Sequence, residues 1–299
     1  MMMNFIHRLS HQTPSRVVLI GGTGIIGKVL ASVLNEANVS VLSLGSDDIN
    51  LLDPEASGHL AGQLKDSDSV VLLAGLAPNR GRGLDTMVAN ISMGMSVCEA
   101  LNRQPVAHVV YVSSDAVYPR GIEYIHEGTP VEPSDSYAAM HLMRERLLAG
   151  LSSMPVVILR CTQISSFEDT HDAYGPNRFR RMAEQEGRIV LFGDGEDRRD
   201  HITVNDVAAI VYRCLLRRSE GILNVATGHS MSFLEVAQTV AACYDPPPRI
   251  ESIPRKIPLT HRHFDIQRLQ AAFPDFRFTP MDADEREIYH QRQLLSSHR

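Results

Sequence analysis

Three glycines near the start of the chain have the spacing of a phosphate-binding loop. Gly21, Gly24 and Gly27 lie in the stretch VVLIGGTGIIG, between an apolar run rich in β-branched residues and a helical pattern. The first glycine permits a tight turn, the second lets the backbone approach a pyrophosphate, and the third lets the helix pack closely. The helix N-terminus then offers free N–H groups and a partial positive charge to phosphate oxygens. The loop therefore predicts that the chain binds NAD or NADP.

The residues after the second apolar run bear on which of the two cofactors binds. An acidic side chain at that point holds a ribose 2′-hydroxyl, whereas a basic one accommodates a 2′-phosphate. The sequence reads Ser46-Asp47-Asp48, and either carboxylate could reach the ribose. Alternatively, both carboxylates only begin a solvated turn. We expect NAD or NADP, with NAD slightly favoured.

Short apolar runs alternate with helical patterns through the first half of the chain. Runs of this kind are typical of strands buried on both faces, and the alternation predicts right-handed crossovers and a parallel sheet. The predicted fold class is therefore α/β, a Rossmann-type doubly wound parallel sheet. The predicted strands span 17–20, 39–44, 70–74, 109–113 and 156–160, and the first predicted helix spans 26–34.

The pattern changes after about Gln163, where Gly, Pro and Arg become frequent and the apolar runs shorten. We predict a flexible N-terminal tail over 1–15, a cofactor domain over 16–162, and a smaller, discontinuous substrate lobe over 163–299. A strong helical pattern over 205–216 indicates that 203–226 returns to the first domain.

Composition excludes several classes of protein. The formal net charge is −6, so no overall basic field attracts nucleic acid. The four cysteines form no C-x-x-C pair, which fits a reducing cytoplasm. No apolar run is long enough for a membrane span, and the N-terminus does not read as a signal peptide. His261 and His263 have the spacing of metal ligands but no carboxylate or cysteine partner, so we expect no metal.

Several motifs follow the glycine loop in order. They are YVSSDAVYP at 111–119, SYAAMH at 136–141, YGPNRF at 174–179, FGDGEDRRDHITVNDVA at 192–208 and LNVATG at 223–228. Together they resemble the extended short-chain dehydrogenase/reductases, and within them the NAD(P)-dependent epimerases, dehydratases and reductases of nucleotide sugars. The resemblance extends from Val17 to about Thr279.

The resemblance implies a set of site residues. Ser114 would supply the catalytic hydroxyl and Tyr137 the general acid/base. The implied cofactor contacts are Gly21, Thr23, Gly24, Ile25, Ile26, Gly27, Ser46, Asn50, Leu51, Ala74, Gly75, Asn90, Tyr137 and His141. The implied substrate contacts are Ser114, Asp115, Gln163, Asn177, Arg178 and Arg199. Asp115 could instead be a cap after the strand. Arg180 and Arg181 are expected on a solvated face.

Position 141 departs from the pattern, because the family has Lys there. A phenol has a pKa near 10 and needs a nearby positive charge to act as a base at neutral pH. A protonated His141 could supply that charge and also bind the nicotinamide ribose, since its reference pKa is near 6.5. Alternatively, a neutral His141 only holds the ribose, and hydride chemistry is slow or lost.

We therefore expect an epimerase or keto-reductase acting on a nucleoside-diphosphate sugar. Dehydration is not expected, because Asp115 is followed by Ala116 rather than the Glu of the related dehydratases. The alternative is a catalytically impaired protein that binds NAD(P) and serves as a sensor or scaffold. We expect no nucleic-acid partner and no membrane association, and we allow for a homodimer.

Overall fold

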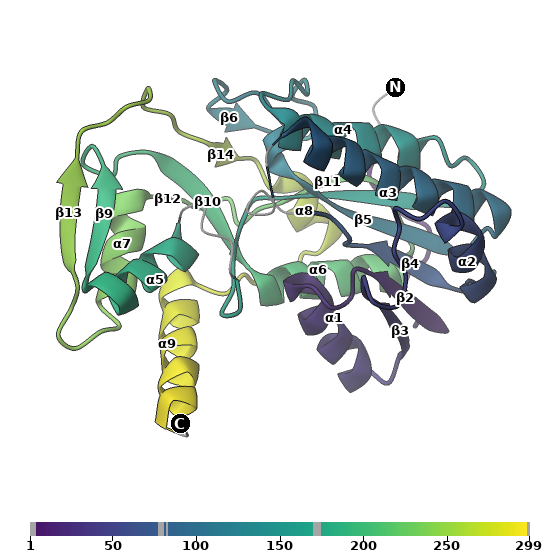
Figure 1. Ribbon diagram of the computed structural model, residues 1–299, viewed down its shortest axis with the longest axis horizontal. Helices are drawn as coiled ribbons and strands as arrows, with labels where there is room; N and C mark the ends of the chain where they lie inside the picture. Colours follow the sequence, from purple (N-terminus) through teal and green to yellow (C-terminus); the bar gives the residue numbers. More distant parts are fainter. Residues whose placement is uncertain (1–3, 77–80, 82, 170–174, 298–299) are drawn as a thin grey trace.

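The computed structural model describes residues 4–76, 81, 83–169 and 175–297 and forms two lobes (Figure 1). Tyr174 of the YGPNRF motif lies outside the described residues. The strands are β1 Ile6–His7, β2 Arg16–Ile20, β3 Ser40–Leu44, β4 Ser69–Leu72, β5 His108–Ser114, β6 Tyr124–Ile125, β7 Val156–Cys161, β8 Gln163–Ser165, β9 Arg188–Phe192, β10 Arg198–Thr203, β11 Ser219–Val225, β12 Ser230–Ser232, β13 Arg249–Ile253 and β14 His263–Phe264. The helices are α1 Ile25–Glu36, α2 Ala56–Gln63, α3 Leu84–Arg103, α4 Ser136–Ala149, α5 Pro176–Glu186, α6 Val204–Arg217, α7 Phe233–Ala241, α8 Gln267–Ala272 and α9 Met281–Ser297, with a short 3-10 turn η2 at Asp115–Val117.

The larger lobe is built on a seven-stranded sheet with the order β1-β11-β7-β5-β4-β2-β3. All neighbouring strands in it are parallel except β1, which is antiparallel to β11. The predicted strands correspond to β2, β3, β4, β5 and β7, and the predicted doubly wound parallel sheet is confirmed. The segment 203–226 forms α6 and β11, and β11 pairs with β7 in this sheet.

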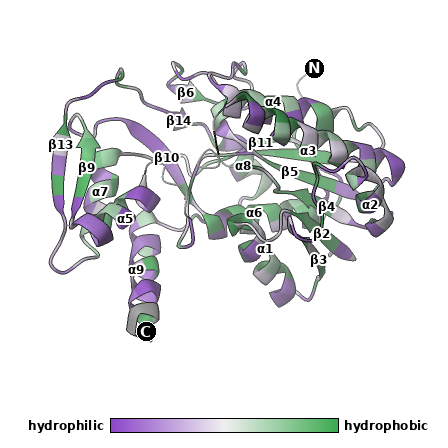
Figure 2. Cartoon of the chain, viewed as in Figure 1, coloured by the Kyte–Doolittle hydropathy of each residue, from purple (hydrophilic) through white to green (hydrophobic). Residues whose placement is uncertain are grey.

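Alternate residues of each central strand enter one of two cores. Val18 of β2 and Tyr111 of β5 pack with residues of α2 and α3, whereas Leu19 and Val110 pack with residues of α1 and α6. Figure 2 shows the strands of this sheet as mostly hydrophobic, as expected for strands covered on both faces. The sheet is therefore a rigid base, and its carboxyl edge faces the smaller lobe.

Residues 4–12 do not form the flexible tail that the composition indicated. Ile6 and His7 pair with Glu220 and Ser219 of β11. The His7 ring lies 2.9 Å from the Ser219 hydroxyl, and the ring of Phe273 packs against it. The prediction failed because this segment is too short to have a periodic pattern, and its strand exists only through the exposed edge of β11.

His108 at the start of β5 makes the fold sensitive to acid. Its Nε2 lies 2.7 Å from the Ser219 carbonyl oxygen, and its Nδ1 is buried without a hydrogen-bond partner among the described residues. Burial lowers the pKa of His108 from 6.5 to about 4. The unfolded chain therefore takes up a proton at higher pH than the folded one. The stabilisation from the neutral ring is complete above pH 6.5 and is lost as the pH falls toward 4.

We expect this residue to account for a loss of about 2 kcal/mol in the free energy of unfolding between pH 7 and pH 5. Urea unfolding at the two pH values measures the loss, and His108→Gln should reduce it by that amount. His11→Gln, at an exposed position, is the matched control and should leave the loss unchanged. An equal pH dependence in wild type and His108→Gln would contradict the assignment.

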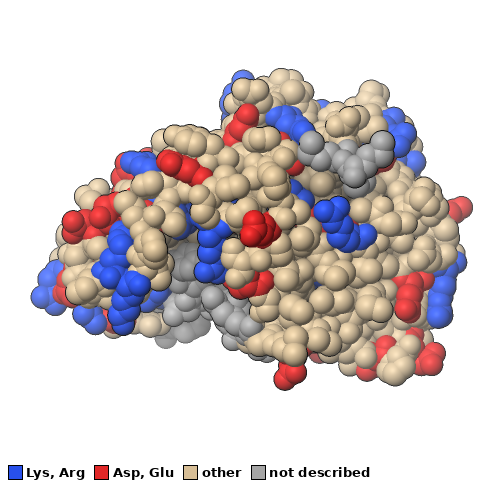
Figure 3. Space-filling model, turned by 90° about the horizontal axis from the view of Figure 1, so that it is seen from above, with Lys and Arg blue, Asp and Glu red and all other residues tan. Residues whose placement is uncertain are grey.

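The smaller lobe contains a parallel pair of strands, β9 and β13, covered by α5 and α7. A second small sheet, of order β12-β10-β8, leads from it to the larger lobe. Asp200 of β10 lies at this junction and accepts hydrogen bonds from Thr162, Thr227 and Gly228. Figure 3 shows acidic and basic side chains interspersed over one face, with basic ones gathered over the end of the smaller lobe.

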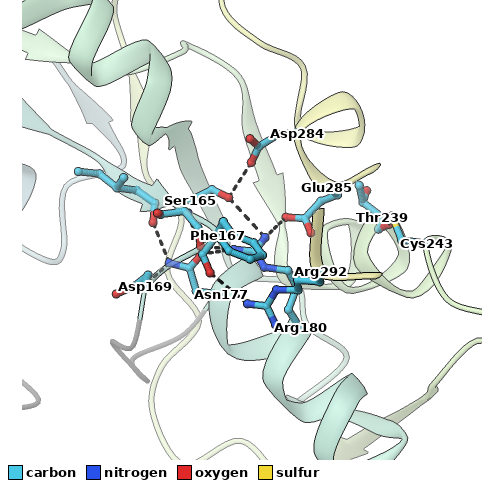
Figure 4. A network of polar contacts seen from close by, with 12 residues as sticks. Ser165, Phe167, Asp169, Asn177, Arg180, Thr239, Cys243, Asp284, Glu285 and Arg292 are labelled. Atoms are coloured by element: carbon cyan, nitrogen blue, oxygen red, sulfur yellow. Dashed lines mark hydrogen bonds and ion pairs between the residues drawn. The ribbon is translucent and has the colours of Figure 1, made fainter. Parts of the chain in front are cut away.

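A buried ionic network joins α5 to α9 (Figure 4). Arg180 forms an ion pair with Glu285 and donates to the Ser166 carbonyl oxygen at 2.9 Å. Asp284 accepts from the Ser165 hydroxyl at 2.8 Å. Arg180 is 2% exposed, so the expected solvated face is wrong for this residue. Its partner is 105 residues away, beyond the reach of any local pattern. The network fixes the N-terminal turn of α5 against β8.

Candidate active site

The glycine loop has the shape that a pyrophosphate requires. Gly21 has a φ of +87°, and a Cβ there would lie 2.4 Å from the Ala74 backbone nitrogen. A Cβ on Gly27 would lie 2.5 Å from the Gly22 carbonyl oxygen, so this glycine packs α1 against the loop itself. A Cβ on Gly24 would meet only the Gly21 carbonyl oxygen, at 3.3 Å. The space beside Gly24 is therefore open to a ligand.

The first turn of α1 suits an anion. Gly24 is the N-cap, no side chain caps the helix, and the first turn, which starts at Ile25 and Ile26, has no acidic residue. Backbone N–H groups and the helix dipole are then available to phosphate oxygens. Thr23 is exposed and lies against Gly45. A Cβ added to Gly45 would be 2.7 Å from the Thr23 methyl group. The loop thus fits the dinucleotide that its sequence predicts.

A cavity of about 510 Å³ lies at the end of β3. Its lining residues include Ser46, Asp47, Asp48, Asn50, Asp53 and His59. Asp48 accepts the Gly45 N–H at 2.8 Å, so this carboxylate does begin a turn. Asn50 uses its amide on Leu52 and Asp53. Leu51, an expected cofactor contact, is buried in the sheet core, and its side chain does not line this cavity.

The loop after β4 forms the other side of the cofactor site. Ala74 donates its N–H to the Ile20 carbonyl oxygen at 2.8 Å, which holds this loop beside Gly21. Asn90 of α3 accepts the Leu76 N–H at 2.7 Å and donates to the Leu76 carbonyl oxygen at 3.0 Å. The Asn90 amide therefore shapes the loop around Gly75, rather than being free for the cofactor.

Ser114 and Tyr137 lie at the carboxyl edge of the sheet. Ser114 ends β5, its oxygen accepts the Ala116 N–H at 3.2 Å, and its hydroxyl forms a hydrogen bond with the Asp115 side chain. Tyr137 lies in the first turn of α4, whose N-cap Asp135 accepts the Ala138 N–H at 2.9 Å. Helix α4 packs against both β5 and η2. This edge is where open α/β sheets bind their ligands.

His141 follows Tyr137 by one helical turn and is neutral. The two rings meet edge to face, with centroids 4.7 Å apart. His141 is buried, and its Nδ1 lies 2.7 Å from the Tyr111 hydroxyl oxygen. Burial, together with the nearby Arg144 cation, lowers the pKa of His141 from 6.5 to about 3. The hypothesis of a protonated His141 that supplies positive charge is therefore wrong. Its Nε2 alone is left for a ribose hydroxyl.

Asp115 faces a cation that the sequence did not single out. Arg262 donates to the Asp115 carbonyl oxygen at 2.8 Å, and its guanidinium lies 3.4 Å from the carboxylate. Burial raises the pKa of Asp115, and Arg262 and Arg199 oppose that rise. The Nε of Arg262 is buried without a hydrogen-bond partner among the described residues. The side chain that caps η2 is Ser114, so the alternative of a cap at Asp115 is wrong.

Two expected substrate residues are engaged within the smaller lobe. Arg199 donates to the carbonyl and hydroxyl oxygens of Thr260, at 2.8 and 2.6 Å. Asn177 bonds to Ser166, Ile164 and Asp169. These contacts brace the lobe and engage polar atoms of both side chains, which the resemblance assigned to the substrate. Arg178 is half-buried on α5.

Gln163 and His201 pair in register where β8 meets β10. The Oε1 of Gln163 and both ring nitrogens of His201 are buried without a hydrogen-bond partner among the described residues. Gly175 lies against them, since its Cβ would be 3.0 Å from the His201 Nε2. Buried polar atoms normally have partners, so this cluster is a candidate contact for a polar ligand.

The family model described as the NAD dependent epimerase/dehydratase family matches residues 17–226. The chain belongs to this family. The family expected from the motifs is confirmed, and with it the NAD(P)-dependent class of enzyme and the type of cofactor.

Other members of the family are similar over most of their length. A UDP-glucose 4-epimerase of Lactobacillus helveticus is 25% identical over 267 residues, which is 75% of this chain and 80% of the relative. A probable GDP-L-fucose synthase of Drosophila melanogaster is 24% identical over 302 residues, 89% of this chain and 94% of the relative.

Solved structures of the family have the same fold. RMD from Pseudomonas aeruginosa, complexed with NADPH, has a TM-score of 0.78 at 23% identity and covers 92% of this chain and 98% of its own. The UDP-glucose 4-epimerase of Thermus thermophilus, in complex with NAD, has a TM-score of 0.79 at 21% identity and covers 92% and 99%.

Sequence reasoning did not single out Arg262, His201 and Tyr111, which the structure places at the candidate site. His201 stands within the RRDHI stretch, two residues after the expected Arg199, so its motif was a usable signal. Arg262 lies 147 residues from Asp115, and no spacing rule relates them. Within the described part of the chain, no helix is long and apolar enough to cross a membrane, and no three metal-ligating side chains gather.

Proposed function

We propose that this family member catalyses epimerisation or keto-reduction of a nucleoside-diphosphate sugar, with Tyr137 as general acid/base and Ser114 as hydrogen-bond donor. The observation that carries this proposal is the position of both hydroxyl groups at the sheet edge that also holds the open glycine loop. The names of the relatives, a UDP-glucose epimerase and a GDP-L-fucose synthase, support this class of substrate.

Each residue has a task that its surroundings allow. The nicotinamide, when bound, accepts or returns a hydride. Tyr137 takes a proton from a sugar hydroxyl, or returns one to a keto group. Ser114 donates its hydroxyl proton to the reacting oxygen in place of the Asp115 carboxylate, with which it forms a hydrogen bond in this structure. His141 holds the nicotinamide ribose through Nε2, since Nδ1 is engaged by Tyr111. Asp115 is followed by Ala116 and paired with Arg262, which supports a reaction without dehydration.

The diphosphate of the substrate needs a cation, and we assign this role to Arg262. Arg262 is 8% exposed and its Nε has no partner among the described residues, so it has a donor left for a phosphate oxygen. Arg199 and Arg178 are the other arginines expected to contribute charge. Gln163 and His201 offer polar atoms for the sugar.

NAD is the proposed cofactor rather than NADP. Asp47 and Asp48 are exposed beside the adenosine-end cavity, whose lining includes no Lys or Arg. A 2′-phosphate there would face two carboxylates, each costing about 1 kcal/mol at contact distance in water. We expect NAD to bind at least about tenfold more tightly than NADP in calorimetric titration at low salt. Asp47→Asn should reduce the ratio of the NAD affinity to the NADP affinity. Asp66→Asn is the control and should leave this ratio unchanged. Equal affinities would contradict the proposal.

A screen of ligands tests the proposed function against the rival sensor or scaffold. UDP-, GDP- and dTDP-sugars are added singly to the protein with saturating NAD, and in a parallel series with saturating NADH for the keto-reduction, and the thermal midpoint is recorded. A substrate at about 100 times its Kd stabilises the folded state by about 2.7 kcal/mol. Stabilisation by one nucleotide series, followed by turnover in the same mixture, supports the enzyme. Stabilisation by NAD alone, with no effect of any sugar nucleotide, overturns it in favour of the sensor.

We further propose that the chain forms a homodimer through α3 and α4. Leu84, Val88 and Met95 on α3 and Met143 on the adjacent α4 are exposed apolar side chains. An apolar surface of this kind is typical of an interface. Sedimentation velocity should show a dimer in wild type and a monomer in Val88→Lys.

All four cysteines are free thiols, which supports the expected reducing cytoplasm.

A further inference from the structure

Arg144 is a buried cation without a carboxylate partner. Its side chain is 2% exposed, yet no carboxylate among the described residues lies within ion-pair distance of it. One nitrogen donates to the Ala74 carbonyl oxygen at 2.8 Å, and Nε is buried with no hydrogen-bond partner in the described part of the chain. Leaving a buried charge unpaired costs several kcal/mol. This cost requires a compensating role.

The titratable groups around Arg144 leave its charge uncancelled. Burial raises the pKa of Tyr111 on β5 and that of Cys98 on α3, the latter to about 11, so both are neutral at pH 7. His141 on α4 is neutral as well, because burial lowers its pKa. Glu145, the acidic residue nearest in sequence, is held by two nitrogens of the Arg160 guanidinium, at 3.0 and 2.7 Å. The positive field of Arg144 therefore extends into the site.

The geometry directs that field toward Tyr137. Residues 137, 141 and 144 follow the spacing i, i+4, i+7, so they share one face of α4. The Arg144 guanidinium carbon lies 5.2 Å from the centroid of the Tyr111 ring. The Tyr111 hydroxyl contacts His141, and the His141 ring meets the Tyr137 ring. Arg144 also lies beneath the Ala74–Gly75 backbone, since a Cβ on Gly75 would be 3.4 Å from its Nη1.

We propose that Arg144 supplies the fixed positive charge of this site and favours the ionised phenol of Tyr137, two helical turns away. The proposal rests on the proposed function only in giving Tyr137 the acid/base role. A neutral position 141 is then compatible with catalysis, because the charge comes from a guanidinium that stays protonated at any pH at which the protein folds. Arg144 acts through Tyr137 and is a positioning residue, not a catalytic one.

The test is the ionisation of Tyr137 itself, which needs no substrate. Tyrosinate formation is followed by near-ultraviolet absorbance, and Tyr137→Phe in each background isolates the Tyr137 signal by difference. We expect the Tyr137 midpoint to rise on the order of one pH unit in Arg144→Gln, and to stay near wild type in Arg144→Lys. Arg146→Met removes an exposed arginine from the same helix and should leave the midpoint unchanged.

An unchanged Tyr137 midpoint in folded Arg144→Gln would overturn the proposal, as would an equal shift in Arg146→Met. Arg144→Met serves if Arg144→Gln does not fold, because it keeps the apolar stem and removes the charge. The absorbance is measured without sugar nucleotide. If no sugar nucleotide is turned over, the proposed function fails, but the effect of Arg144 on the Tyr137 midpoint is still tested by this titration.

Discussion

Tyr137→Phe lowers turnover by about 10²- to 10⁴-fold, the usual contribution of a positioned acid/base, and costs NAD binding at most one hydrogen bond. Only the hydroxyl is lost, because the phenyl ring retains its edge-to-face contact with His141. The helix cap at Asp135 is untouched, so the fold is retained. Steady-state rates on the sugar nucleotide found in the screen, with calorimetric titration of NAD, measure both quantities.

Tyr124→Phe is the matched control for this substitution. Tyr124 is 73% exposed and stacks on His263 in β14, away from the glycine loop. It should keep full turnover. Full turnover in Tyr137→Phe as well would mean that another group transfers the proton, and the acid/base assignment would be abandoned.

Gly24→Val is expected to abolish measurable NAD binding without unfolding the protein. A Cβ at Gly24 meets a single backbone atom, so the fold has room for a side chain. That side chain would occupy the open space beside the first turn of α1, where the pyrophosphate must approach the backbone. Calorimetric titration reports the affinity, and circular dichroism reports the fold.

Gly27→Val provides the contrast, because the glycines of one loop have different tasks. A Cβ at Gly27 overlaps three backbone atoms of Gly22, all within 2.6 Å. We expect this variant to be destabilised by about 1–3 kcal/mol or more, since the backbone must move to relieve the overlap. Retained NAD affinity in folded Gly24→Val would show that the cofactor does not approach the loop at this point.

His141 is neutral, so it does not supply the positive charge of the lysine that the family has at this position. A missing lysine indicates a weakened enzyme only if no other cation reaches the tyrosine. Arg144 stands three residues further along the helix, and its guanidinium is buried among uncharged groups. The face of α4 lacks the lysine at position 141 but carries Arg144 two turns from Tyr137. The titration of Tyr137 decides whether this guanidinium replaces the lysine.

The sequence by itself determined the features that depend on neighbouring residues. The glycine spacing predicted the loop that turns at Gly21 and opens at Gly24, because a positive φ is a local property of the backbone. Continuous apolar runs predicted β2, β4 and β5, since a strand covered on both faces is apolar throughout. The ordered motifs predicted the family.

Only the tertiary structure decided the charges and partners within the site. The ionisation of His141 depends on its burial beside Tyr111, 30 residues away, and on Arg144. Arg262 reaches Asp115 and Arg199 reaches Thr260 across separate elements. Residues 6 and 7 form a strand only because β11 ends the sheet beside them. A pKa or a hydrogen bond is set by whatever the fold brings into contact, and one-dimensional spacing carries no information on contacts between distant segments.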